Sequence, residues 1–129
     1  MAFNAGGSNV GGTFVLEQGE LTSGTDSESI TADATYNQTF TVPAGKIWTL
    51  KGAQSYKGSG TYTIGTQNLR IGTGGNNVTI HSVAGMVYFL PAFLSLSAGN
   101  TITIQTPITS YSVTGDLISR ILYTEASVA

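Results

Sequence analysis

The sequence predicts an all-β protein, a single jelly-roll or Greek-key β-sandwich of eight or nine strands. Three observations support this prediction. Apolar residues alternate with Thr, Ser and Asn through most of the chain, which is the period of a strand buried on one side. Clusters of Gly, Pro and Asn separate these runs at short intervals. Only 9% of the 129 residues are charged, against about 25% in an average domain, while 19 Thr, 13 Ser and 17 Gly supply the polar and turn positions.

The first segment, residues 1–12, is dominated by Gly, Asn and Ser and contains few apolar residues, among them Phe3 and Val10. A segment of this composition has little to bury, so we expect a flexible N-terminal arm. We expect the sandwich domain to span 13–129. That length supports one domain with a real core but not two.

Apolar residues spaced two apart predict the individual strands. These are Tyr36, Phe40 and Val42; Trp48 and Leu50; Tyr62 and Ile64; Leu69 and Ile71; Val78 and Ile80; Leu94 and Leu96; Ile102 and Ile104; and Tyr111 and Val113. Thr fills many intervening positions, and its β-branched side chain favours the pleated backbone. Turns are expected at 43–45, 58–60, 72–77, 98–100 and 115–116, where Gly, Pro, Asn and Asp gather.

Two stretches of the chain resemble each other. Residues 40–50 align without gaps on 94–104, with Ala-Gly at the same offset and alternating apolar residues on both sides. The pattern predicts two similar hairpins, each closed by a tight Ala-Gly turn.

The segment 116–125 fits two structures. Leu117, Ile118, Ile121 and Leu122 have helical spacing behind a potential Asp116 N-cap. The same residues also fit a strand, with Ile118, Arg120 and Leu122 on one face and Leu117, Ile121 and Tyr123 on the other. We favour the strand because everything before it has the period of a strand, and its two apolar faces predict that both sides are covered.

The most apolar stretch, 86–94, spans nine residues and is interrupted by Pro91. It is too short for a transmembrane helix, which needs about 20 residues. A strand that is apolar on both faces lies either in the centre of a sandwich or against another subunit. If the second reading holds, Tyr88, Phe89 and Phe93 are the candidate subunit-interface residues.

Few residues are available for chemistry. The chain has no Cys and one His, His81, which excludes disulfides, thiol catalysis and metal sites that need two such ligands. No nucleophile, phosphate-loop or calcium-loop motif is present. The net charge of −2 argues against nucleic-acid binding. We therefore expect no enzyme, cofactor or metal.

The charged residues fall into two regions. The carboxylates at 17–33 are expected to be a solvated stretch or to complement a basic partner. The basic residues Lys46, Lys51, Lys57 and Arg70 could pair with the acidic region of another copy in self-association.

Several segments resemble proteins of phage particles. They are Thr-Val-Pro-Ala-Gly-Lys-Ile-Trp-Thr-Leu at 41–50, the Gly-rich leader, the repeat of the Ala-Gly turn within 96–104, and Ile-Ser-Arg-Ile-Leu-Tyr-Thr-Glu at 118–125. In style the region 36–125 resembles the jelly-roll decoration (cement) proteins of tailed-phage heads. That resemblance implies trimers that sit on the capsid at quasi-threefold positions and bridge neighbouring coat subunits.

The resulting functional hypothesis is a virion structural protein made in the host cytoplasm and located on the capsid surface. Its expected partners are the major coat protein and two further copies of itself, with no nucleic acid and no membrane. The start of the chain has no basic region followed by an apolar run, so we expect no secretory signal. Phe3, Asn4 and Val10 are the candidate coat-binding residues of the arm. The alternative is a phage fibre, receptor-binding or carbohydrate-binding module, in which Tyr56, Tyr62 or Tyr111 would stack on sugar rings.

Overall fold

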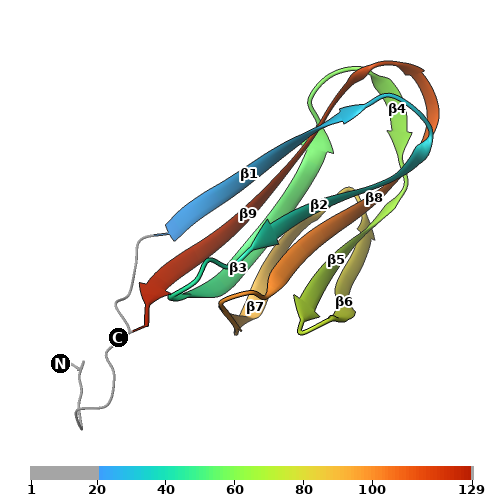
Figure 1. The fold of residues 1–129 in the computed structure, drawn as a ribbon. Coiled ribbons are helices and arrows are strands. Elements are labelled where there is room, and N and C mark those ends of the chain that lie inside the picture. The colour runs from blue at the N-terminus through green and yellow to red at the C-terminus, as the bar shows by residue number, and fades with distance from the viewer. Residues whose placement is uncertain (1–20, 129) are drawn as a thin grey trace, which may run out of the picture.

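The computed structural model describes residues 21–128 and, within this range, all side chains except those of 88–93. Its nine strands are β1 (Leu21–Ile30), β2 (Ala34–Thr41), β3 (Lys46–Lys57), β4 (Thr61–Ile64), β5 (Thr66–Thr73), β6 (Asn76–Ala84), β7 (Val87–Ser97), β8 (Thr101–Val113) and β9 (Gly115–Ser127). Figure 1 shows them as an elongated two-layer sandwich. The arm predicted at 1–12, with Phe3, Asn4 and Val10, and the boundary that follows it lie outside the described residues.

The strands form two antiparallel sheets. The four-stranded sheet has the order β1-β9-β3-β7, and the five-stranded sheet has the order β2-β8-β5-β6 with β4 also paired to β8. β4 and β5 pair with successive parts of β8, so together they act as one interrupted strand. This order is that of a jelly roll, in which the chain crosses repeatedly between two sheets. The predicted all-β sandwich is confirmed.

The two predicted Ala-Gly hairpins are wrong. β2 pairs with β8 and β3 pairs with β7 and β9, so the turn at 43–45 carries the chain from one sheet to the other. The turn at 98–100 does the same between β7 and β8. The two turns bond to each other instead, through Val42 N–H to Asn100 O at 3.0 Å and Gly99 N–H to Val42 O at 2.9 Å. The similarity between the two stretches therefore reflects two corners that meet at one end of the sandwich.

The strand interpretation of 116–125 is confirmed by β9, which lies between β1 and β3. Its residues alternate between buried positions, such as Leu117 and Ile121, and half-buried positions on the outer face. Gly115 starts this strand rather than forming a separate turn with Asp116. A side chain at Gly115 would collide with the backbone of Ser59, because the β3–β4 turn packs directly against it.

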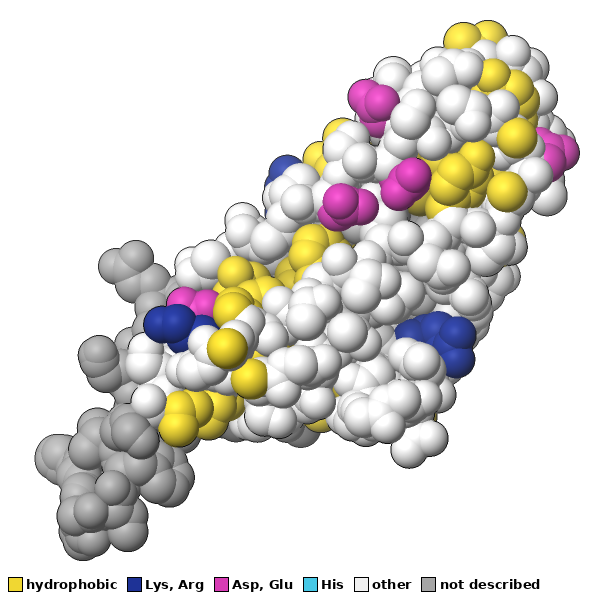
Figure 2. All heavy atoms as spheres, in the orientation of Figure 1, with side chains coloured by type: hydrophobic (Ala, Val, Ile, Leu, Met, Phe, Trp, Pro, Cys, Tyr) yellow, Lys and Arg dark blue, Asp and Glu magenta, His cyan; other side chains and the backbone are white. Residues whose placement is uncertain are grey.

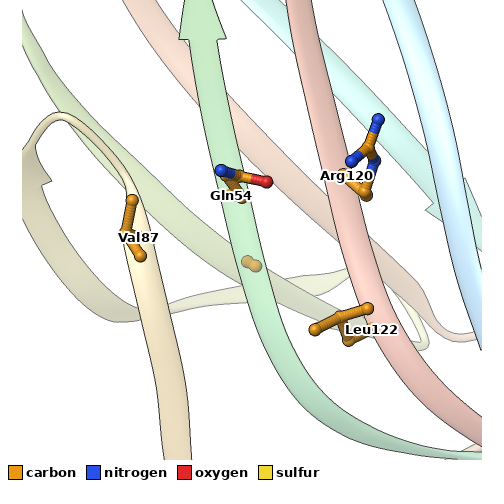
Figure 3. A pocket seen from close by; sticks show the side chains of 5 residues that line it. Gln54, Val87, Arg120 and Leu122 are labelled. Carbon is orange, nitrogen blue, oxygen red and sulfur yellow. The ribbon is translucent and has the colours of Figure 1, made fainter. Parts of the chain in front are cut away.

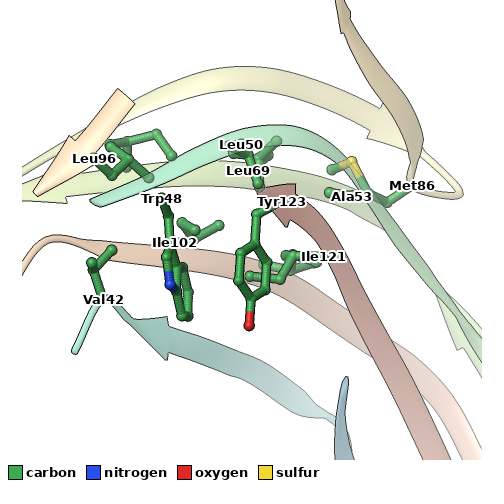
Figure 4. Close-up of a cluster of buried hydrophobic side chains, with 12 residues drawn as sticks. Val42, Trp48, Leu50, Ala53, Leu69, Met86, Leu96, Ile102, Ile121 and Tyr123 are labelled. Carbon is green, nitrogen blue, oxygen red and sulfur yellow. The ribbon is translucent and has the colours of Figure 1, made fainter. Parts of the chain in front are cut away.

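The core consists of two hydrophobic clusters. The larger one is drawn in Figure 4 and contains Val42, Trp48, Leu50, Ala53, Leu69, Ile71, Met86, Leu96, Ile102, Ile104, Ile121 and Tyr123. Within it, the Trp48 and Tyr123 rings stack with their centroids 4.0 Å apart. The smaller cluster contains Ile30, Tyr62, Ile108 and Leu117. Both clusters draw residues from both sheets, which is what holds the two layers together.

Buried polar side chains also occupy the interior. Gln38 donates to the carbonyl oxygens of Leu117 at 3.0 Å and Asp26 at 3.2 Å, and it accepts a hydrogen bond from the Ser119 hydroxyl. The Ser119 and Ser55 hydroxyl oxygens are 3.0 Å apart. Because every polar atom of the Gln38 amide has a partner, its burial costs little, and the network joins β1, β2, β3 and β9.

A second polar group fixes the connection between β6 and β7. The backbone N–H of Met86 donates to Gln67 Oε1 at 2.7 Å, and Gln67 Nε2 donates to the Thr106 hydroxyl at 2.8 Å. Gln67 and Thr106 are both buried. Met86 O in turn accepts from the backbone N–H of Ser55 at 2.8 Å. These bonds tie the start of β7 to both sheets.

Candidate functional site

The outer face of the four-stranded sheet contains a hollow of about 220 Å³ lined by Ala53, Gln54, Val87, Arg120 and Leu122 (Figure 3). The strands explain where it forms. The register of β3 shifts between Leu50 and Gly52, and Gly52 pairs with Leu122 of β9. Because Gly52 has no side chain, nothing from β3 fills the surface at that point of the sheet. Gln54 pairs with both Arg120 and Val87, which places these three side chains on the same face.

The hollow is apolar with a polar border. Val87 is 62% exposed, and Leu122 is half-buried. Arg120 Nε lies 3.4 Å from the Thr25 hydroxyl, so its guanidinium reaches toward β1. The volume is below the 300–1,000 Å³ typical of small-molecule sites. It has room for one or two apolar side chains, and its lining offers no nucleophile and no carboxylate.

Strand β7 places the predicted interface residues beside this hollow. By register, Tyr88 pairs with Ala53 and Phe89 pairs with Gly52. Leu50 then pairs with Leu94, so residues 90–93, including Phe93, stand opposite Lys51 alone. The side chains of Tyr88, Phe89 and Phe93 lie outside the described part of the structure. Their role in a subunit interface therefore stays a prediction.

The tyrosines proposed as a sugar-stacking platform do not share a surface. Tyr62 is only 3% exposed, and its hydroxyl donates to Asp116 O at 2.6 Å. Burial, and secondarily the charge of Asp116, raise the pKa of Tyr62. Tyr111 is half-buried against the smaller core cluster, and its hydroxyl lies 2.6 Å from the Thr114 hydroxyl. Tyr56 is the most exposed of the three, on β3.

Other candidate groups also find structural roles. Lys46 lies 4.0 Å from Glu125, which also accepts a hydrogen bond from Trp48 Nε1 at 2.9 Å. Asp33 accepts the backbone N–H of Tyr111 at 2.8 Å and so ties the β1–β2 connection to β8. Among residues 21–128, no group of three or more His, Asp or Glu side chains is placed to hold a metal ion. The described residues also include no helix that is long and apolar enough to cross a membrane.

The outer face of the five-stranded sheet is a second candidate surface, which the sequence pattern alone does not reveal. Three rows of paired residues cross its strands: Asn37, Gln105, Asn68 and Ser82; Thr39, Thr103, Arg70 and Thr79; and Thr41, Thr101, Gly72 and Asn77. The alternation of Thr and amide residues was visible in the sequence. Only the pairing of four distant strands brings these residues into rows.

Comparison with known proteins places the chain in no family. No protein-family model matches it, and no curated protein matches it. Among solved structures, the chain is similar to the crystal structure of dimeric latent PorU from Porphyromonas gingivalis, at 15% sequence identity and a TM-score of 0.38. The match covers 95% of this chain but only 14% of that one. A likeness this weak supports no conclusion about function.

Proposed function

We propose that this protein is a capsid decoration (cement) protein of a phage. In this proposal a homotrimer binds the outside of the head, contacts the major coat protein and bridges neighbouring coat subunits. The observation that carries the proposal is the apolar hollow on the outer face of the four-stranded sheet. It lies beside β7, an edge strand that includes most of the chain's most apolar stretch. Exposed apolar surface next to a sheet edge is typical of a protein–protein interface.

A closed trimer would use this surface three times. Each copy would offer the hollow and Val87 to its neighbour, and the rotation that relates the copies would close a ring. The positions of Tyr88, Phe89 and Phe93 extend the same edge, and aromatic residues are enriched at the centre of such interfaces.

Attachment to the capsid would use other parts of the chain. The arm residues Phe3, Asn4 and Val10 are the proposed coat contacts. Three arms held in one trimer bind as a unit, so weak individual contacts add up to firm attachment. The low charge of the chain limits repulsion between closely packed copies. Such contacts exist only in the assembled shell, and they therefore stabilise it against the pressure of packaged DNA.

Self-association tests the carrying observation. Sedimentation velocity of the purified chain should give three times the 13.4 kDa chain mass at micromolar concentration. Val87→Asp should shift the protein to monomer, because a charge would be buried in the interface. Val113→Asp is the matched control, since Val113 is 55% exposed and lies on β8 instead. A monomeric wild-type protein, or equal effects of the two variants, would contradict the trimer.

Electron cryo-microscopy of the native particle tests the location. The expected density lies on the head at quasi-threefold positions, and deletion of residues 2–12 should lower the occupancy there without unfolding the domain. Density at a fibre or tail tip would instead support the alternative, a fibre or receptor-binding module. Full occupancy after the deletion would show that the arm does not contribute to capsid attachment.

A further inference from the structure

Arg70 is a cation to which the described residues supply no counter-charge. It is the one Lys, Arg, Asp or Glu residue in the strands β2, β4, β5, β6 and β8, and it lies in the middle row of the five-stranded sheet. Within the described residues its Nε atom is buried and has no hydrogen-bond partner, and no carboxylate pairs with its guanidinium. The side chain as a whole is only half-buried, so the part of the guanidinium that remains accessible can bind an anion from outside the folded chain.

The residues around Arg70 present hydroxyl and amide groups. On the strand at one side, Thr103 pairs with Arg70, and the Thr103 hydroxyl lies 2.9 Å from that of Thr39. On the other side Thr79 pairs with Arg70. Each of these hydroxyls can both donate and accept a hydrogen bond.

The two flanking rows continue this chemistry. In one, Ser82 donates to Asn68 Oδ1 at 2.7 Å and Asn68 donates to Gln105 Oε1 at 3.2 Å, which fixes the amides in place. In the other, a side chain at Gly72 would collide with the Thr101 hydroxyl and the Asn77 amide. These two side chains therefore occupy the space above Gly72, so the row has no gap at the glycine.

We propose that the outer face of the five-stranded sheet binds an acidic polysaccharide. The Arg70 guanidinium holds a carboxylate of the sugar chain, and the Thr and amide rows on both sides hydrogen-bond to the sugar hydroxyls. The proposal does not depend on a capsid location, since a decoration protein and a fibre module can both expose this face.

Charge and surface chemistry select this ligand. A single cation is too little for nucleic-acid binding, which needs several phosphate contacts at physiological salt. The three rows contain no aromatic or aliphatic side chain, whereas protein interfaces depend on such anchors. A polyhydroxyl chain with regularly spaced carboxylates supplies both the anion for Arg70 and the hydroxyls for the rows. Because no ring stacks on the sugar, binding per site is weak and gains strength from several copies acting together.

The proposal is tested by measuring binding to immobilised polygalacturonate. Two control ligands are dextran, a neutral polysaccharide, and poly-L-glutamate, an acidic chain without sugar hydroxyls. The full chain should bind polygalacturonate only. Arg70→Gln should weaken this binding at least about tenfold, since a hydrogen bond to a charged group is lost. Thr103→Val should weaken it by about threefold, as expected for a hydrogen bond between uncharged groups.

Lys57→Gln is the control, because it also removes one positive charge but lies on β3 of the other sheet, outside the residues that line the hollow. It should bind polygalacturonate within about twofold of the wild type if the site is confined to the five-stranded sheet. Unfolding curves of the variants establish that all of them fold. Three results would overturn the proposal: no retention on polygalacturonate at millimolar uronate, equal retention of Arg70→Gln, or equal binding to poly-L-glutamate, which would point to an acidic protein.

Discussion

The two sheets share one core but differ in the surfaces that they turn outward. The strands of the four-stranded sheet carry eight charged residues, Asp26, Glu28, Lys46, Lys51, Lys57, Asp116, Arg120 and Glu125, whereas those of the five-stranded sheet carry Arg70. Figure 2 shows acidic side chains gathered toward the end of the sandwich that holds β4, while the surface over β2 is mostly uncharged. The apolar hollow lies on the four-stranded sheet.

The inner and outer faces of the two sheets are under different constraints. The inner faces must be alike because they fill a common core at close-packed density. The outer faces do not share a core, so they are free to differ. One face displays an apolar hollow, and the other displays rows of hydroxyls and amides with a single cation.

The strongest test of the shared core compares one leucine from each sheet. Leu50 of β3 and Leu69 of β5 are both fully buried in the larger cluster. Leu50→Ala and Leu69→Ala should each lower the free energy of unfolding by about 2–5 kcal/mol, because each leaves a cavity. Urea unfolding measures both. A loss under about 1 kcal/mol for one of them would mean that the sheets do not contribute equally to the core.

The next effect concerns a polar side chain that links the sheets. Gln38→Ala should lower the free energy of unfolding by about 2–4 kcal/mol, since it leaves the Ser119 hydroxyl and two backbone carbonyls without this partner. The neighbouring Asn37→Ala, on the exposed outer face, should change it by less than about 0.5 kcal/mol. Similar losses in the two variants would show that the buried network is not specific to Gln38.

A smaller effect is expected at alkaline pH, from one tyrosine in each sheet. Burial and then Asp116 raise the pKa of Tyr62, and burial and then Glu125 raise that of Tyr123. Above pH 10 the unfolded chain loses these protons before the folded chain does, so stability falls as pH rises.

Unfolding measured between pH 9 and pH 11 should show this decline, at about the pH where a free tyrosine titrates. Tyr62→Phe and Tyr123→Phe should each make it shallower, because phenylalanine keeps the ring and removes the titrating group. A decline unchanged in both variants would assign it to other groups.

Replacing the arginine on either outer face should change the free energy of unfolding least. Arg70→Thr should raise the free energy of unfolding by about 0.5 kcal/mol, because it removes a buried Nε that lacks a partner. Arg120→Thr should lower it slightly, since Arg120 contacts the Thr25 hydroxyl. A clear loss of stability in Arg70→Thr would mean that the apolar stem of this side chain contributes more than its unpaired atom costs.

Much of the fold was predictable from local pattern. Alternation correctly assigned Trp48, Leu50, Leu69, Ile102 and Ile104 to the interior. It also favoured a strand for 116–125, which β9 confirms. The same pattern put Val78 and Val113 on an apolar face, yet these residues are 59% and 55% exposed. Alternation indicates on which side of a strand a residue lies but not whether another layer covers that side. For β6, an edge strand, the cover is incomplete.

The candidate surfaces were harder to predict. The apolar stretch at 86–94 pointed to β7, but the hollow beside it depends on Gly52 lying opposite Leu122, far away in sequence. Arg70 looked like one of four cations in a basic region. Its isolation appears only in the sheet, where β8 and β6 flank β5, β2 flanks β8, and none of these three strands contains Lys, Arg, Asp or Glu.

The sequence by itself determined the all-β class, the approximate number of strands and most of the inward-facing residues, because these depend on backbone preference and a period of two. Tertiary structure decided which strands pair, and therefore that the turns at 43–45 and 98–100 are corners between sheets rather than hairpins. It also decided which polar residues are buried and what each outer face displays. Pairing joins residues up to about a hundred positions apart, and no local signal contains that information.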